Sequence, residues 1–283
     1  MLFKRPDGRL IRGLDPIFQL ISHVMTQRND AQVFYKMDVR TDGMDEYIKK
    51  CYKDDGLDIS YTDILIAALV RTIALRPQLN RFVVNSRVFA RHEIVFSLSI
   101  KRVLDDASEE TIVKFTFNGT ETLEEISQNM RKTIQESMVS DNKTDELVAS
   151  LMRLPHFFIK SAVRILKWMD LHNMLPASFL EGSPFHTGVF FTNTKSIGLN
   201  YVYHHIYNFG TAGLFLSIGK AHLVPTSGRG GMSVRRILSL GLTFDERICD
   251  GLYLANSMRT VQRYLSDPAL LEAPLEERVR DID

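Results

Sequence analysis

Residues 235–271, RRILSLGLTFDERICDGLYLANSMRTVQRYLSDPALL, join a strand-like apolar run to an amphipathic helix pattern. Apolar residues crowd the stretch before Asp245, and those after Gly251 recur at helical spacing. Two adjacent acids, an arginine and an Asp-Gly pair lie between the two elements. Because binding and catalytic groups are frequent where strands end, this segment is a candidate site as well as the main guide to the fold.

The rest of the chain predicts helices and strands that do not alternate regularly. Helix starts are marked by Asp15 with Pro16, by Ser60 with Asp63, and by Thr122 with Glu125. Strands are predicted at 31–39, 81–89, 93–100, 111–117, 187–193, 213–219 and 235–244. This mixture predicts an α+β fold, a two-layer sandwich in which helices cover a mixed sheet.

The totals are those of an ordinary folded protein, and we expect one domain spanning residues 1–283. The chain is 45% hydrophobic and 24% charged, and its net charge of +1 gives no reason to expect nucleic acid as a partner. Cys51 and Cys249 are too few for a disulfide framework and lack metal-ligand spacing. No signal-peptide pattern and no apolar run of about 18 residues occurs. We therefore expect a cytoplasmic protein without a metal site.

Residues 156–170 predict a helix with a basic stripe and several large apolar side chains. Lys160, Arg164 and Lys167 recur at helical spacing among aromatic residues such as Trp168. Such a helix can pack against the protein body or a neighbouring subunit, or it can lie on a membrane surface. Because these stripes are common on soluble proteins, packing is our expectation and membrane contact is the alternative.

Further polar groups with possible chemical roles lie around the predicted strand at 187–193. They are His186, the pair Thr192-Asn193, and the adjacent His204 and His205. Cys249 would act as a nucleophile only with a histidine beside it in space. The glycine-rich segment GRGG at 228–231 precedes a strand, so it predicts a hairpin turn rather than a phosphate-binding loop.

Together and in this order, these segments resemble the catalytic domain of 2-oxo-acid dehydrogenase acyltransferases, relatives of chloramphenicol acetyltransferase. In that family a strand ends in Asp-His-Arg, two apolar residues and Asp-Gly, before a helix that closes near Asp-Pro; this chain has DERICDG and then SDP. SYTDILIAALVRTIALRPQLNRFV and TLEEISQNMRKTIQ are similar to two of the family's helices, and VFFTNTKSIG to its strand with a Ser/Thr-Asn pair. The resemblance covers residues 12–270. It implies a chloramphenicol-acetyltransferase-like sandwich, a coenzyme A thioester as co-substrate, and a homotrimer with its pocket between subunits.

The resemblance also assigns roles to single residues. Glu246 stands at the position of the family's general-base histidine, and Thr192 matches the hydroxyl that stabilises the oxyanion. Asp250 is expected to support the loop, and Asn193 and Gly251 are the expected substrate-binding residues.

Glutamate is a poorer base than histidine for this chemistry. A free glutamate has a pKa of about 4.3 against about 6.5 for histidine. Taking a proton from a thiol of pKa about 8.5 is therefore unfavourable by roughly four pKa units for glutamate and roughly two for histidine. His204 or His205 is an alternative source of an imidazole base. Two functions stay open: a divergent acyltransferase that acts on an unknown acceptor, and a non-catalytic binding or scaffold protein, a pseudoenzyme that has lost its base.

Two further departures from the family concern assembly. The chain shows no lipoyl domain and no subunit-binding segment, so we do not expect it to form the core of a dehydrogenase complex. Residues 140–185 are longer than the family's usual connection and predict an atypical helical insertion, which would cover the channel or alter assembly.

Overall fold

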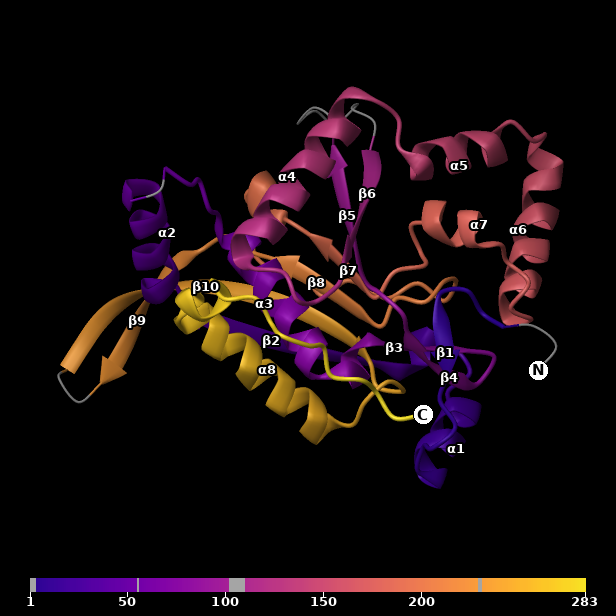
Figure 1. Ribbon diagram of the computed structural model, residues 1–283, viewed down its shortest axis with the longest axis horizontal. Helices are drawn as coiled ribbons and strands as arrows, with labels where there is room; N and C mark the ends of the chain where they lie inside the picture. Colours follow the sequence, from indigo (N-terminus) through magenta and orange to yellow (C-terminus); the bar gives the residue numbers. More distant parts are fainter. Residues whose placement is uncertain (1–3, 55, 102–109, 229–230) are drawn as a thin grey trace.

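The computed structural model describes residues 4–54, 56–101, 110–228 and 231–283, and Figure 1 shows the arrangement of its elements. The helices are α1 (Pro16–Val24), α2 (Asp42–Asp54), α3 (Tyr61–Leu75), α4 (Leu123–Val139), α5 (Lys143–Met152), α6 (His156–Leu171), α7 (Ala177–Gly182) and α8 (Gly251–Ser266). The strands are β1 (Gly8–Leu10), β2 (Gln32–Arg40), β3 (Arg81–Val84), β4 (Arg87–Arg91), β5 (Ile94–Lys101), β6 (Glu110–Phe117), β7 (Val189–Thr192), β8 (Leu214–Ile218), β9 (His222–Gly228) and β10 (Gly231–Asp245).

A seven-stranded mixed sheet forms the centre of the molecule. Its order is β2-β10-β8-β7-β5-β6, and β9 pairs with the first half of β10. The strands β5, β7 and β8 are parallel, and the remaining neighbours are antiparallel. A second, three-stranded sheet has the order β1-β4-β3. Because the parallel strands end at the same edge of the large sheet, residues that follow β5 and β7 lie close together there.

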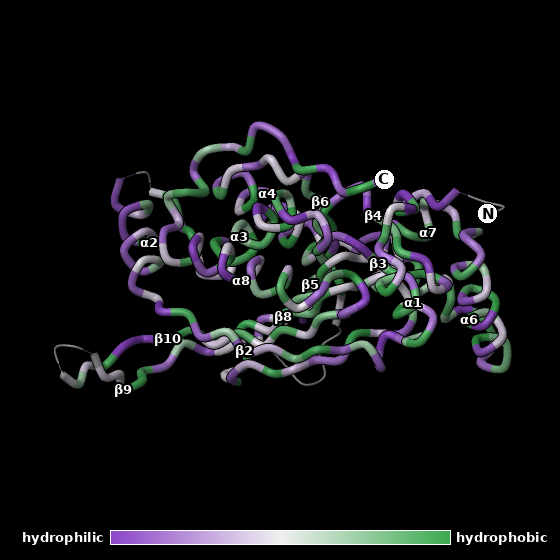
Figure 2. Tube along the Cα trace, turned by 90° about the horizontal axis from the view of Figure 1, so that it is seen from below, coloured by the Kyte–Doolittle hydropathy of each residue, from purple (hydrophilic) through white to green (hydrophobic). Residues whose placement is uncertain are grey.

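Helices α2, α3, α4 and α8 cover one face of the large sheet, as Figure 2 shows. The central helix α3 is buried almost all round, and side chains such as Ile64 and Leu65 share one core with Phe96 and Phe191 of the sheet. Burial of each such side chain contributes about 1.5–3 kcal/mol. The arrangement confirms the predicted α+β sandwich and explains why α3 is buried on nearly all sides instead of along one stripe.

The helix starts lie where the capping residues predict them. The Asp15 side chain caps α1. At α3 the backbone N–H of Ser60 donates to the Asp63 carboxylate at 2.8 Å, and the N–H of Asp63 donates to Ser60 Oγ at 3.3 Å. Thr122 and Glu125 form the same reciprocal box at α4. Local sequence therefore sets these boundaries.

The prediction for β2 is correct in position but only half correct in its buried face. Met37 and Val39 are buried, whereas Val33 and Tyr35 are exposed. β2 lies at one edge of the sheet and pairs with β10 over its whole length, so the difference between its two halves comes from what packs on the face of the sheet. The strand β9 was not predicted, because Pro225 interrupts its pattern and the side chains beside it are largely exposed. Helix α2 was also not predicted.

The hairpin of β9 and the first half of β10 projects from the body of the molecule (Figure 1). Gly228 pairs with Gly231 across this hairpin, while residues 229–230 of the predicted turn lie outside the described part of the chain. Leu223 and Met232 on the hairpin are exposed. The β9–β10 hairpin thus carries apolar side chains that the rest of the described chain does not cover.

Helices α5, α6 and α7 lie to one side of the sheet (Figure 1). The end of α6 is tied to the N-terminal segment, because Arg5 Nη1 donates to the buried Asp170 carboxylate at 2.7 Å. Phe157 and Trp168 on the outer side of α6 are 78% and 52% exposed. Among the described residues, no helix combines the length and apolar character needed to cross a membrane.

Candidate active site

The turn after β10 is fixed by a buried cluster of charges. Asp245 is buried, and its carboxylate accepts hydrogen bonds from Arg247 Nε at 2.8 Å and Arg247 Nη2 at 2.7 Å. Arg28, which is also buried, donates through Nε to the Oδ2 atom of this carboxylate at 3.3 Å. Burial lowers the pKa of Arg28, although the charge of Asp245 opposes the shift. Asp245 is therefore committed to holding the turn in place.

Glu246 has different surroundings from its neighbour. Its side chain is half-buried, and its backbone N–H donates to the Ala31 carbonyl at 2.9 Å. Within the described part of the chain, its carboxylate has no hydrogen bond or ion pair. The backbone of Glu246 is thus fixed while its carboxylate stays available.

Asp250 and Gly251 begin helix α8. The exposed Asp250 side chain accepts the N–H of Tyr253 at 2.8 Å and so caps the helix. A Cβ added at Gly251 would meet open space. Asp250 therefore fixes the point where the turn passes into α8, whereas a side chain at position 251 would meet no obstacle.

Thr192 and Asn193 lie at the other end of the sheet, where β7 ends. Both line a cavity of about 630 Å³ between α3, α4, β5 and β7, which Ser60 and Arg131 also line. The Oδ1 atom of Asn193 is buried and has no hydrogen-bond partner among the described residues. A buried acceptor without a partner costs about 1–3 kcal/mol, so a ligand N–H or O–H at this point would be stabilised.

A second threonine near this cavity has a hydroxyl that already makes hydrogen bonds within the protein. Thr194 is buried, and its hydroxyl lies 2.9 Å from the carbonyl oxygens of both Asn200 and Ile218. The hydroxyl of Thr192 makes no hydrogen bond within the described ranges. Thr192 is therefore the threonine whose hydroxyl stays available to a ligand.

The strand register separates Thr192 from Glu246. Thr192 pairs with Ser217 of β8, and Ser217 pairs with Gly241 of β10. Asp245 lies four residues further along β10, about 14 Å at the usual rise of 3.4 Å per residue. Two strand spacings add roughly 10 Å sideways. Within one chain, the two predicted catalytic residues therefore lie at opposite ends of the sheet.

The two adjacent histidines lie on the sheet face that the helices leave open. The His204 ring stacks on Phe215 at 4.1 Å, and burial lowers the pKa of His204. Phe215 belongs to a small apolar cluster with Phe190, apart from the main core beneath the helices. The sheet thus separates these imidazoles from the cavity that Asn193 lines. Residues that lie near one another in the sequence are therefore on opposite faces of the sheet.

His186 and Cys249 do not have the surroundings of catalytic groups. His186 is buried, with Nδ1 2.7 Å from Ser183 Oγ and Nε2 3.3 Å from the Asp170 carboxylate, and burial lowers its pKa. Burial, with the nearby charge of Asp250, raises the pKa of Cys249 to about 12, so its thiol is not activated. In the described ranges, no group of three or more His, Cys, Asp or Glu residues is arranged to hold a metal ion.

Sequence reasoning missed two groups that border the cavity with Thr192. Ser60 and Asp63 were identified only as a helix cap, and Arg131 was not singled out. Arg131 Nη1 lies 3.2 Å from Asp58 and Nη2 lies 3.5 Å from Asp63, so it joins α4 to the start of α3. No spacing in the sequence relates these positions, because they meet only through the packing of the two helices.

Comparison with known proteins identifies the fold. Residues 188–273 match the family described as 2-oxoacid dehydrogenases acyltransferase (catalytic domain). Nearly the whole chain is similar to a probable dihydrolipoamide acetyltransferase from Listeria monocytogenes 4b F2365, with a TM-score of 0.55 and 14% identity over 90% of this chain and 93% of that chain. A chloramphenicol acetyltransferase matches with a TM-score of 0.54 and 12% identity, over 91% of this chain and 99% of that chain. The chain has the chloramphenicol acetyltransferase fold.

A third structure with the chloramphenicol acetyltransferase fold comes from a multienzyme complex. It is a truncated catalytic core of the 2-oxoacid dehydrogenase complex from Thermoplasma acidophilum, with a TM-score of 0.55 and 14% identity over 92% of this chain and 99% of that chain. No curated protein matches the chain significantly. The matched segment 188–273 includes both Thr192 and Glu246.

Proposed function

We propose that this chain is a divergent CoA-dependent acyltransferase whose active site is completed by a second copy of the chain. The observation that carries the proposal is the placement of two available groups, Thr192 and Glu246, at opposite ends of one sheet. Within a single chain, Thr192 and Glu246 cannot both contact one substrate. In a cyclic assembly, the sheet end that carries Glu246 in one subunit can lie beside the sheet end that carries Thr192 in its neighbour.

In this assembly each residue has a separate task. The Glu246 carboxylate of one subunit takes the proton from the attacking thiol or hydroxyl of the acceptor. As the acceptor adds to the thioester carbonyl, the Thr192 hydroxyl of the next subunit donates to the oxyanion that forms there. Collapse of this intermediate breaks the C–S bond and releases CoA, whose thiolate takes the proton back from Glu246. The unpartnered Oδ1 of Asn193 accepts an amide N–H of the pantetheine arm of CoA. Asp250 fixes the turn that carries Glu246, and Gly251 beside it leaves open space for the substrate.

Exposed apolar groups support self-association, and we propose a homotrimer. Ile17, Leu20 and Val24 form an uncovered apolar face on α1, with exposed fractions of 61%, 55% and 71%. The edge strand β2 and the projecting β9–β10 hairpin add exposed apolar side chains. Neighbouring subunits would cover such surfaces, because contiguous exposed apolar patches usually mark interfaces.

Titration of the purified protein with CoA and acetyl-CoA, followed by a thiol-release assay with candidate acceptors, tests the proposal. Thr192→Val should lower turnover by about ten- to a thousandfold, since an oxyanion donor is lost, while Thr192→Ser should retain most of it. Glu246→Gln should lower turnover by about a hundredfold or more, and Glu277→Gln, which changes an exposed glutamate, should not. A folded protein that does not bind CoA would instead support the non-catalytic scaffold function.

A second proposal concerns partners: the outer side of α6 contacts an anionic membrane surface. Its exposed aromatic residues, Phe157 and Trp168, lie beside the basic stripe of Lys160, Arg164 and Lys167. No Asp or Glu occurs between residues 147 and 169. A second copy of this surface would be repelled by the same positive charge, whereas anionic lipid would be attracted to it.

A further inference from the structure

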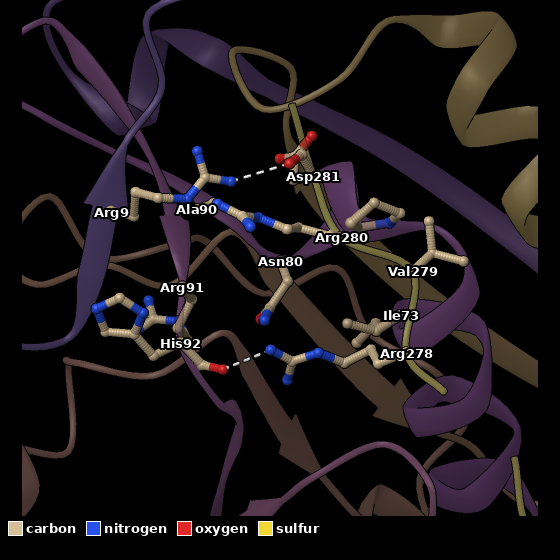
Figure 3. Close-up of a pocket in the computed structure, with 11 residues that line it drawn as sticks. Arg9, Ile73, Asn80, Ala90, Arg91, His92, Arg278, Val279, Arg280 and Asp281 are labelled. Carbon is tan, nitrogen blue, oxygen red and sulfur yellow. Dashed lines mark hydrogen bonds between the residues drawn. The ribbon is translucent and has the colours of Figure 1, made fainter. Parts of the chain in front are cut away.

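A pocket between the C-terminal segment and the small β1-β4-β3 sheet is unusually rich in arginine. Its volume is about 400 Å³, and Arg9, Arg91, Arg278 and Arg280 are among the residues that line it. Figure 3 shows Arg278 and Arg280 extending from the C-terminal segment toward β4, and Arg9 approaching from β1. The four side chains come from three separate segments and converge on one pocket.

The acidic residues nearby do not neutralise these arginines. Asp281 lines the pocket, but both of its carboxylate oxygens bind Arg81 at 2.7 Å. One exposed carboxylate, that of Asp283, serves both Arg9 and Arg280, at 3.0 and 2.9 Å. The pocket therefore keeps an excess of positive charge.

The hydrogen bonds of Arg278 go to neutral acceptors. Arg278 donates to the carbonyl oxygens of His92 at 2.7 Å and Asn118 at 3.4 Å. Carbonyl oxygens hold the guanidinium in position without cancelling its charge. The side chain is thus oriented while its charge remains available to an anion.

Arg91 is the buried member of the group. Its Nη2 donates to Thr187 and Thr211, while Nε is buried and has no partner within the described ranges. The closest carboxylate, that of Asp7, is 3.7 Å away and also binds Arg5 at 2.7 Å. Burial lowers the pKa of Arg91 to about 10, with Arg5 adding to the shift and Asp7 opposing it. A buried cation with an unmatched N–H is stabilised by any anion that enters the pocket.

We propose that this pocket binds a small ligand that carries a phosphate group, held by Arg278 and Arg280 at the rim and by the charge of Arg91 within. Several arginines from different segments suit the three oxygens and double charge of a phosphate, because guanidinium groups bind such oxygens in pairs of parallel hydrogen bonds. The volume admits a phosphate together with a small organic group. The site goes beyond the proposed acyl transfer and uses none of its residues.

Calorimetric titration of the full chain with inorganic phosphate and with pyrophosphate, in chloride buffer, tests this site. We expect saturable binding that Arg278→Gln weakens by about ten- to a hundredfold, the effect of one charge-assisted hydrogen bond. Arg280→Gln should also weaken binding. Within the described part of the chain, the only hydrogen bond of the Arg280 side chain is to exposed Asp283, so folding is not at risk. The matched control is Arg259→Gln on the exposed side of α8, which should bind like the wild type.

The source of the phosphate is distinguished by comparing CoA with 3′-dephospho-CoA. Tighter binding of CoA that Arg280→Gln abolishes identifies the ligand as the 3′-phosphate of CoA, and equal binding of the two identifies a free phosphorylated compound. Absence of saturable phosphate and pyrophosphate binding, or equal affinity in Arg280→Gln and Arg259→Gln, would overturn the proposal. Glu246→Gln should bind phosphate normally, so failure of acyl transfer would not be mistaken for failure of this site.

Discussion

Two neighbouring acids at the end of β10 have opposite surroundings. Asp245 is buried between Arg28 and Arg247, whereas the carboxylate of Glu246 has no bonded partner within the described part of the chain. Asp245 holds the turn in place, and the turn leaves the Glu246 carboxylate available to a substrate. A substitution should therefore affect stability at the first position and chemistry at the second.

The stability effect at Asp245 can be tested with a matched pair of variants. Asp245→Asn leaves two buried guanidinium groups facing a neutral side chain, so we expect a loss of about 3–5 kcal/mol in the free energy of unfolding. Asp283→Asn removes a carboxylate that is 80% exposed and should cost no more than about 1 kcal/mol. Urea unfolding measures both, and similar losses in the two variants would contradict the role of Asp245.

Acid should destabilise the protein through the buried pair of His186 and Asp170. Burial lowers the pKa of His186, so as the pH falls below about 6.5 the unfolded chain gains a proton that the folded chain does not. Burial alone would raise the pKa of Asp170, but His186 and Arg5 outweigh it and lower that pKa, so further stability is lost as the pH falls below about 3.9. The stabilising contribution is therefore present at neutral pH and is lost on acidification.

Thermal unfolding between pH 7.5 and 5.5 measures the histidine part of this effect. Each titrating group contributes at most about 1.4 kcal/mol per pH unit. His186→Gln should flatten the dependence, whereas His205→Gln, which removes an exposed imidazole, should leave it unchanged. The assignment to His186 fails if both variants keep the wild-type slope.

At the scale of elements, helices α3 and α6 differ in how far the rest of the chain buries them. α3 needs both its capping box and the core around it, because a helix that is buried on nearly all sides has no solvent-exposed face to orient it. α6 has the opposite character, since its large apolar side chains remain exposed on one side. The sequence predicts both helices, but only the packing shows that one is covered and the other is not.

The uncovered side of α6 should bind vesicles that contain anionic lipid. The wild type should co-sediment with phosphatidylglycerol-containing vesicles but not with pure phosphatidylcholine, and added salt should reduce the bound fraction. Lys160→Glu should weaken binding at least about fivefold, since each basic residue near the surface contributes about 1 kcal/mol. Lys49→Glu, on the exposed side of α2, is the control. Equal binding to neutral vesicles would rule out the electrostatic contact, and a loss of self-association in Lys160→Glu would assign α6 to a subunit interface.

At the scale of the whole molecule, the separation of Thr192 and Glu246 determines whether one chain can form the proposed active site. Their positions in the register lie about 14 Å apart along the strands, with two strand spacings between them. Exposed apolar surface on α1, β2 and the β9–β10 hairpin offers contacts to other copies. Chemistry that needs both residues therefore depends on assembly.

Mixing two inactive variants tests this dependence directly. Thr192→Val and Glu246→Gln chains, unfolded and refolded together, should regain activity, because some interfaces combine an intact Thr192 with an intact Glu246. Random mixing at equal amounts gives about one intact site in four. Each variant refolded alone is the control. Activity no higher than that of the separate variants would mean that the two residues do not share a site.

Much of the fold and part of the site could be predicted from the sequence. Capping pairs such as Ser60 with Asp63 act within one turn, so the sequence alone fixes where α3 begins. The apolar run before Asp245 likewise predicts β10 and the turn that follows it. The exposed first half of β2 and the cavity next to Asn193 were not predictable, because both depend on neighbours that are distant in the chain.

The sequence by itself determined the α+β class, the helix starts and the resemblance of the DERICDG turn to an acyltransferase motif, because these are local patterns of caps, periodicity and spacing. Only the tertiary structure decided that His204 lies across the sheet from the cavity that Asn193 lines, and that Thr192 and Glu246 occupy opposite ends of that sheet. The same holds for the arginine pocket, whose members come from β1, β4 and the C-terminal segment. The physical reason is strand register: hydrogen bonds between strands fix which distant residues share a level, and no spacing along the chain records that choice.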